Sequence, residues 1–165
     1  MINTSILNYK LSEPSLLFLM LPHSGRDYGN AFKDISDLSL KELRKSEDIY
    51  LDLLLEDSSL NFNYLKANFP RVFVDVNRSP LEIDTSMWKD CTGGSMFTRS
   101  FKVESGIGVI PKVCFSGVNI YNQILLFKEA RSRLLNYYFP YHKKIKSFIY
   151  EIKKHHNKVY VLDCH

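Results

Sequence analysis

The sequence predicts an α/β domain with three layers, in which a mostly parallel sheet carries helices on both faces. Short apolar segments at 16–21, 72–76 and 158–162 have the length of buried strands and are bounded by polar or turn-forming residues. Between them lie stretches whose apolar residues recur every three or four positions, as on one face of a helix. Short strands that alternate with helices are typical of a parallel sheet covered on both sides.

The composition is that of an ordinary globular protein. The chain has 165 residues, a length that suits one domain, and we take residues 1–165 as that domain. The net charge of +4 is small and the basic residues are scattered, so nothing supports nucleic-acid binding. Three cysteines without Cys-x-x-Cys spacing favour reduced thiols in the cytoplasm. The apolar segment 16–21 is too short to cross a membrane, and we expect no signal peptide.

The first expected strand, 16–21, is followed at once by Pro22, His23, Ser24 and Gly25. Open α/β sheets place their ligand sites at the carboxyl ends of parallel strands. Proline fixes φ and glycine permits a sharp turn, so His23 should be held at a defined position. His23 is therefore a candidate ligand-site residue, and the alternative is an ordinary turn histidine.

A helix is expected to begin at Ser39, because Glu42 is placed to complete a capping box. Apolar residues continue at helical spacing to Leu54, interrupted by a polar run at 44–48. Two short helices joined near Ser46 therefore fit as well as one long helix. Residues 60–69 form a connection of uncertain form.

The second expected strand is Val-Phe-Val-Asp-Val at 72–76, with Asn77 and Arg78 at its tip. Residues 81–105 are expected to form a long loop or a small excursion. The segment 106–111 is expected to make a tight turn followed by a short strand. It is a weak candidate for a phosphate loop, because no Lys-Ser/Thr follows it.

The last part of the chain predicts two helices and a strand. Apolar residues from 120 to 134 recur at helical spacing, and Pro140 is expected to open the next helix. The third expected strand, 158–162, ends at Asp163, Cys164 and His165.

Three strand tips would then carry His23, Asn77 with Arg78, and His165. Histidines from separate strand ends, together with a carboxylate, suit a catalytic zinc with three protein ligands and one open position. Arg78 offers a planar fork for a substrate carboxylate. Asp75 and Asp163 are expected to be structural partners at their strand ends. The alternative is two turn histidines and a surface arginine.

Six motifs follow one another along the chain: Pro22-His23-Ser24-Gly25-Arg26-x-Tyr28, Glu47-Asp48, Val74-Asp75-Val76-Asn77-Arg78, Gly106-x-Gly108-Val109-Ile110-Pro111, Tyr138-x-Pro140-Tyr141-His142 and Asp163-Cys164-His165. Together they resemble the N-formylglutamate amidohydrolase family, which is related in fold to zinc carboxypeptidases and aspartoacylases. The resemblance extends from about residue 16 to the last residue.

The resemblance implies zinc-dependent hydrolysis of the formyl amide of N-formyl-L-glutamate, or of a similar N-acyl amino acid, to formate and the amino acid. It implies that His23, Asp48 and His165 bind the zinc. Glu47 is the alternative acidic ligand, because the spacing differs from the His-x-x-Glu of the carboxypeptidases, where the acidic position would fall on Arg26.

By the same resemblance, Asn77 and Arg78 would hold the α-carboxylate of the substrate and Arg71 would stabilise the oxyanion. The family continues beyond the Asp-Cys-His motif, and its general-base glutamate lies in that further part, so we expect a domain that is incomplete at its C-terminus. Two hypotheses remain. One is a zinc-dependent amidohydrolase, and the other is a non-catalytic remnant or a subunit that needs a second polypeptide supplying the C-terminal half.

Overall fold

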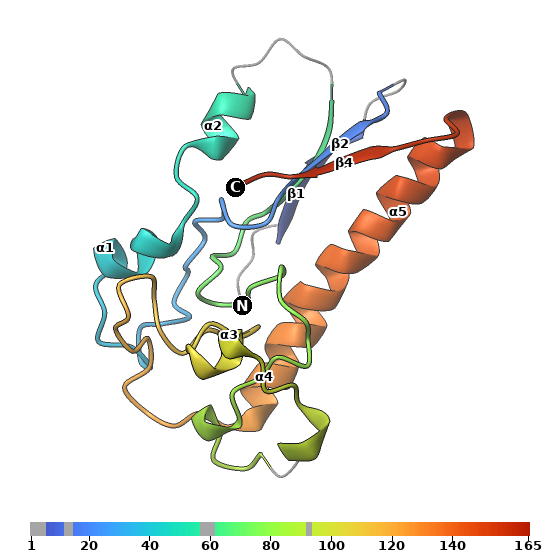
Figure 1. The fold of residues 1–165 in the computed structure, drawn as a ribbon. Helices are drawn as coiled ribbons and strands as arrows, with labels where there is room; N and C mark the ends of the chain where they lie inside the picture. Colours follow the sequence, from blue (N-terminus) through green and yellow to red (C-terminus); the bar gives the residue numbers. More distant parts are fainter. Residues whose placement is uncertain (1–5, 12–14, 57–61, 92–93) are drawn as a thin grey trace.

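The computed structural model describes residues 6–11, 15–56, 62–91 and 94–165. It contains a four-stranded sheet in the order β1-β3-β2-β4 (Figure 1). The strand β2 (Leu17–Leu21) runs parallel to both of its neighbours, β3 (Asn63–Ala67) and β4 (Tyr160–Asp163). The strand β1 (Leu7–Lys10) is antiparallel to β3. The predicted α/β class with a mostly parallel sheet is therefore confirmed.

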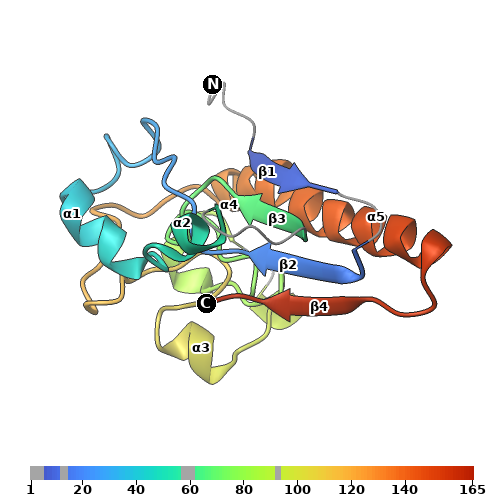
Figure 2. The same ribbon diagram turned by 90° about the horizontal axis from the view of Figure 1, so that it is seen from above.

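Helices cover both faces of the sheet, as Figures 1 and 2 show. The long helix α5 (Phe139–His155) lies along one face and the short helix α2 (Leu51–Glu56) lies on the other. Successive side chains of β2 point to opposite faces. The ring of Phe18 accordingly lies 5.4 Å from that of Phe148 in α5, whereas Leu19 belongs to a separate apolar cluster with residues of α2.

The predicted helix start at Ser39 is confirmed. The helix α1 (Leu40–Leu43) has a complete capping box, in which Glu42 N donates to Ser39 Oγ and Ser39 N donates to the Glu42 carboxylate. A 3₁₀ turn, η1 (Arg44–Ser46), follows, and α2 begins only at residue 51. The structure therefore has two short helices, separated by an irregular segment that includes Tyr50 at a φ of 69°.

The prediction of a strand at 72–76 is wrong. Its valines are buried, but the backbone turns, because the amides of Phe73 and Val74 both donate to the Pro70 carbonyl. The next strand along the chain is instead β3, which pairs with β2 and lies inside the segment 60–69 that the pattern left undefined. Residues 60 and 61 lie outside the described ranges. An apolar run thus indicated burial correctly but not sheet pairing.

Other boundaries also differ from the expectations. The short strand expected within 106–111 is not formed, and the nearest pairing is an isolated bridge between Val113 and Asn119. The described residues of the segment 81–105 form three short helices: η2 (Thr85–Met87), η3 (Gly94–Met96) and α3 (Phe101–Glu104). Strand β1 was not predicted.

The helix expected from 120 begins later, as α4 (Phe127–Arg133), and a π-helical turn, η4 (Leu134–Tyr138), joins it directly to α5. Pro140 lies in the first turn of α5, as predicted. Within the described part of the chain, no helix has the length and apolar character needed to span a bilayer.

Candidate metal centre and the adjoining cavity

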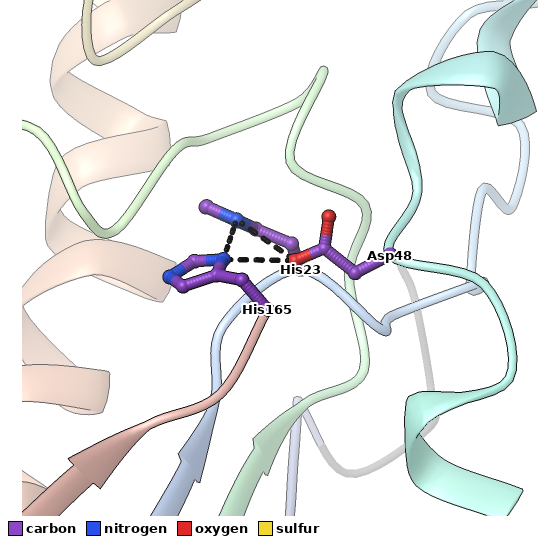
Figure 3. A group of neighbouring side chains, drawn as sticks. All are labelled: His23, Asp48 and His165. Atoms are coloured by element: carbon purple, nitrogen blue, oxygen red, sulfur yellow. Dashed lines mark hydrogen bonds and ion pairs between the residues drawn. The ribbon is translucent and has the colours of Figure 1, made fainter.

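Three side chains, His23, Asp48 and His165, converge beyond the carboxyl ends of β2 and β4 (Figure 3). His23 Nδ1 lies 3.3 Å from His165 Nδ1 and 3.4 Å from Asp48 Oδ2. His165 Nδ1 lies 2.9 Å from the same oxygen. A tetrahedral zinc with bonds of about 2.0–2.1 Å separates its ligand atoms by about 3.3 Å. The spacing and the donor types therefore fit a zinc ion bound by three protein ligands.

Sheet topology explains why the two histidines meet. His23 follows β2 and His165 follows β4, and these strands are adjacent and parallel, so both side chains emerge at the same end of the sheet. Asp48 reaches the same point from the segment between η1 and α2. Two hydrogen bonds fix the backbone of Asp48. Asp48 N donates to the His23 carbonyl at 3.2 Å, and Ser24 Oγ donates to the Asp48 carbonyl at 3.4 Å.

Glu47, the alternative acidic ligand, is buried and contacts other side chains. Its carboxylate accepts a hydrogen bond of 2.9 Å from the Tyr28 hydroxyl and lies 3.2 Å from Arg44 Nε and 3.6 Å from Arg26 Nε. Burial and this carboxylate raise the pKa of Tyr28 well above its usual range. The structure thus brings Asp48, and not Glu47, to the two histidines.

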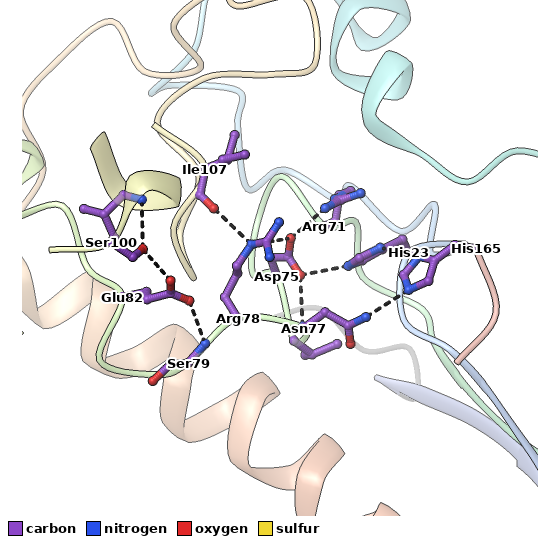
Figure 4. Close-up of polar contacts among 12 residues, drawn as sticks. His23, Arg71, Asp75, Asn77, Arg78, Ser79, Glu82, Ser100, Ile107 and His165 are labelled. Atoms are coloured by element: carbon purple, nitrogen blue, oxygen red, sulfur yellow. Dashed lines mark hydrogen bonds and ion pairs between the residues drawn. The ribbon is translucent and has the colours of Figure 1, made fainter. Parts of the chain in front are cut away.

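Asp75, which was expected to be a structural partner but with no partner named, is the closest described partner of His23. The two side chains are both buried, and His23 Nε2 lies 2.8 Å from Asp75 Oδ1 (Figure 4). Asp75 also accepts hydrogen bonds from Arg71 Nη2 at 2.8 Å and from Asn77 N at 2.9 Å.

Burial acts to raise the pKa of Asp75, but the hydrogen bond and charge of His23 together with Arg71 outweigh it and hold that pKa well below its usual range. An ionised Asp75 favours the His23 tautomer with its proton on Nε2. The lone pair of Nδ1 then faces the position where a metal would lie. The only sequence signal for this role was the place of Asp75 in the motif that ends in Asn77-Arg78.

His165 has more open surroundings. Its Nε2 lies 3.3 Å from Asp163 Oδ2 and 3.0 Å from Asn77 Nδ2, and the Asn77 amide also donates to Asp163 at 2.6 Å. Burial acts to lower the pKa of His165, but hydrogen bonds to Asp48 and Asp163 raise it overall. Asn77, predicted to contact substrate, therefore lies beside the candidate metal ligand His165 in this structure.

A cavity of about 230 Å³ adjoins the candidate metal centre through Asp75, which lines the cavity and contacts His23. Arg71 and Arg78, both predicted to act on substrate, line this cavity. Arg78 Nε donates to the Ile107 carbonyl at 3.2 Å and lies 3.8 Å from Asp75 Oδ2. The complete lining is Ser46, Arg71, Val72, Asp75, Arg78, Ile107, Pro111, Val113 and Phe115.

The remaining motifs support the backbone around these groups. The Tyr138 hydroxyl donates to the Arg78 carbonyl at 2.8 Å, and Asp75 N donates to the Val109 carbonyl at 2.8 Å. Two glycines permit close backbone contacts: a Cβ on Gly25 would lie 2.2 Å from the Phe69 carbonyl oxygen, and one on Gly108 would lie 2.4 Å from that of Glu82. Larger residues at either position would push these segments apart.

The sequence profile of a family described as N-formylglutamate amidohydrolase matches residues 15–165. The chain is also similar to the crystal structure of N-formylglutamate amidohydrolase from Ralstonia eutropha JMP134, with a TM-score of 0.83 and 27% sequence identity. That similarity covers 98% of this chain and 58% of the Ralstonia chain, so this chain spans less than two thirds of that protein's length. No curated protein sequence matches it.

Proposed function

This chain belongs to the N-formylglutamate amidohydrolase family, and from that membership we propose that its metal centre and adjoining cavity serve the hydrolysis of an N-acyl amino acid, such as N-formyl-L-glutamate, with release of formate. The observation that carries the proposal is the spacing of the three ligand atoms on His23, Asp48 and His165, directly beside a cavity with two arginines. A cytoplasmic location fits the three cysteines, all of which are free thiols.

Zinc is the metal that we assign to this centre. Two imidazole nitrogens and one carboxylate oxygen are usual zinc ligands, and three protein ligands leave one position open. When bound, zinc would polarise the formyl carbonyl and lower the pKa of a water molecule to about 7. The His23 ring would already be oriented for zinc binding, because Asp75 contacts the nitrogen on the opposite side of the ring.

Arg78 and Arg71 are the residues proposed to bind the substrate. Among the described residues, the terminal nitrogens of Arg78 have no hydrogen-bond partner, so both can donate to an α-carboxylate in a bidentate pair. Arg71 is held by Asp75 on one nitrogen and lines the same cavity, so its guanidinium is proposed to stabilise a developing oxyanion. For Asn77 to contact the substrate as well, its amide must turn away from Asp163 and His165.

The described residues offer no uncommitted general base beside the ligand atoms. Asp48 is a proposed ligand, Asp75 is bound to His23, and Asp163 contacts both His165 and Asn77. We therefore propose that this chain alone turns over substrate poorly, if at all, and that a second polypeptide supplies the base.

The edge of the sheet supports this second candidate, a subunit that pairs with another chain. Tyr160, Val161 and Leu162 on β4 are 56%, 38% and 50% exposed, and β4 pairs with β2 only, among the strands that the structure describes. An edge strand with exposed apolar residues is a template for pairing with another strand.

The test is to titrate the purified chain with zinc and to measure formate release from N-formyl-L-glutamate. Asp48→Asn should lose zinc binding by at least about tenfold, whereas Glu47→Gln should retain it and serves as the matched control. Equal zinc binding by Asp48→Asn and the wild type would contradict the metal centre.

The assay is repeated with the polypeptide encoded directly downstream of this chain. Formate release only on mixing supports the need for a second chain. Robust release by the chain alone would refute that need and direct the search for a base to its own residues.

A further inference from the structure

The turn 76–78, which ends in Arg78, is hydrogen-bonded to side chains of the helical segment formed by η4 and α5. The Tyr138 hydroxyl donates to the Arg78 carbonyl at 2.8 Å. His142 Nε2 lies 3.0 Å from the Val76 carbonyl oxygen. A carbonyl oxygen can only accept, so this contact requires the proton of the His142 ring on Nε2. Two of the three carbonyl groups of the turn therefore receive donors from one helix.

The π-helical turn η4 brings a third donor to the same side of the helix. Arg133, the residue before η4, donates to the Phe73 carbonyl at 3.3 Å and is five positions before Tyr138. Residues five apart lie on different sides of an α-helix, whereas a π-helical turn, with its i→i+5 hydrogen bonds, brings them close to one side. His142 follows Tyr138 by four positions, and their rings lie 4.4 Å apart. Single π-helical turns of this kind are frequent at functional sites.

The side chains of the same turn point toward the candidate site (Figure 4). Asn77 Nδ2 lies 3.0 Å from His165 Nε2, and Arg78 Nε donates to the Ile107 carbonyl at 3.2 Å. Arg78 is thus held at two points, by Tyr138 on its backbone and by Ile107 on its side chain. A side chain that is already held in its binding orientation loses less freedom when a ligand binds.

From these contacts we infer that Tyr138 and His142 are positioning residues for the substrate, because they hold the turn 76–78 and thereby direct Arg78 into the cavity. The inference rests on the proposed function, in which Arg78 binds the α-carboxylate. Neither Tyr138 nor His142 is among the described residues that line the cavity, so both act through the turn and not by contact with the substrate.

The experiment measures the binding of N-formyl-L-glutamate to the zinc-supplemented chain by isothermal titration calorimetry. Tyr138→Phe should weaken this binding about fivefold, the factor that corresponds to one lost hydrogen bond. Its affinity for zinc should change less than about twofold, because the candidate ligands lie on other segments. A general loss of folded structure would instead lower both affinities.

The matched control is Tyr137→Phe, the same substitution one residue earlier in η4. The ring of Tyr137 packs edge-on against Phe69 and Phe73, at 5.2 and 5.1 Å between ring centroids, and not against the turn 76–78. This variant should bind N-formyl-L-glutamate as tightly as the wild type.

Two substitutions of His142 separate its hydrogen bond from its packing. His142→Gln keeps an N–H donor that can reach the Val76 carbonyl, whereas His142→Leu has a similar size and no donor. The glutamine variant should bind the ligand within about twofold of the wild type, and the leucine variant about fivefold more weakly.

Arg78→Ala tests whether Tyr138 acts through Arg78. In this background, Tyr138→Phe should weaken ligand binding by less than about twofold, because the side chain that Tyr138 directs is already absent. A fivefold loss that persists in the Arg78→Ala background would overturn the inference.

The other outcomes separate this inference from the proposed function. If Tyr138→Phe binds N-formyl-L-glutamate as tightly as the wild type, or if Tyr137→Phe weakens binding equally, the inference is overturned and the proposed function stands. Equal losses in the two His142 variants would remove His142 from the positioning role. If the wild type does not bind the ligand, the proposed function fails and this inference fails with it.

Discussion

His23 and His165 offer the same ring nitrogen, Nδ1, to the same point, yet they are anchored in different surroundings. His23 and its partner Asp75 are each 2% exposed, and β2, the strand before His23, has a neighbour on each side. His165 and its partner Asp163 are 44% and 38% exposed and lie at the carboxyl end of β4, a strand at the edge of the sheet. We refer to these as the interior half and the edge half of the candidate metal centre.

The comparison shows that one half of the centre is part of the core, whereas the other is a surface contact. Removing one partner of a buried hydrogen-bonded pair lowers stability strongly, because the remaining group stays buried without its hydrogen-bond partner. Exposed ion pairs contribute little, since water competes for both groups. The interior half should therefore be formed before a metal binds, and the edge half should be ordered mainly by the metal or by a partner that covers β4.

The largest expected effect is on folding without metal. His23→Ala should lower the free energy of unfolding by about 3 kcal/mol, because it opens a cavity and removes a donor from buried Asp75. His165→Ala should cost less than about 1 kcal/mol. Urea unfolding in the presence of EDTA measures both, and equal losses would show that the two halves do not differ.

The second prediction compares the residues that orient the two rings. Asp75→Asn should weaken zinc binding by about 10- to 100-fold, since it disturbs the His23 tautomer. Asp163→Asn, the matched change in the edge half, should weaken it by less than about fivefold. Competition titration with a zinc chelator measures the affinities, and a larger effect from Asp163→Asn would reverse the comparison.

The third prediction concerns stability in acid, and it tests a buried carboxylate outside both halves of the centre. Asp52 is buried between Arg26 Nη2 at 2.9 Å and Lys66 Nζ at 3.0 Å. Burial acts to raise the pKa of Asp52, but the hydrogen bond and charge of Lys66, with Arg26, lower it overall.

A carboxyl group whose pKa is lower in the folded state stabilises the protein above its unfolded pKa, near 3.8, and this contribution is lost as the pH falls through the folded value. Asp52→Asn should therefore reduce stability by about 1–2 kcal/mol at pH 7 and flatten the loss of stability between about pH 5 and pH 2. Urea unfolding across this pH range is the measurement. An unchanged acid slope would show that Asp52 does not contribute to acid sensitivity.

The smallest expected effect is on the edge strand itself. Leu162 is half exposed, although it lies opposite buried Leu19 in the β2–β4 ladder. Leu162→Lys should change the stability of the isolated chain by less than about 0.5 kcal/mol, but it should reduce self-association, because a lysine on an edge strand opposes pairing. Thermal melting and light scattering over a range of concentrations measure the two effects. A loss of stability well above 1 kcal/mol would indicate that β4 is already covered in solution.

Local chemistry was enough to predict several elements. The capping box at Ser39 and Glu42, the proline in the first turn of α5 and the apolar run of β2 each depend on residues close together in sequence. The family resemblance followed from six ordered motifs and predicted the α/β fold that the structural similarity confirms. It also named His23, Asp48 and His165, which the structure brings together, although their metal-binding role is still a proposal.

The tertiary structure alone decided which partners these residues have. Residues 72–76 are buried as their apolar character indicated, but β3 takes the place beside β2, because pairing depends on which segment reaches the strand and not on hydrophobicity. Asp48 rather than Glu47 faces the histidines, because Tyr28, Arg26 and Arg44 hold Glu47 elsewhere. The contact between His23 and Asp75 joins residues 52 positions apart, and no local pattern records such a contact. The sequence by itself therefore determined the candidate ligands and the class of fold, whereas chain packing determined how each ligand is oriented and which half of the centre is buried.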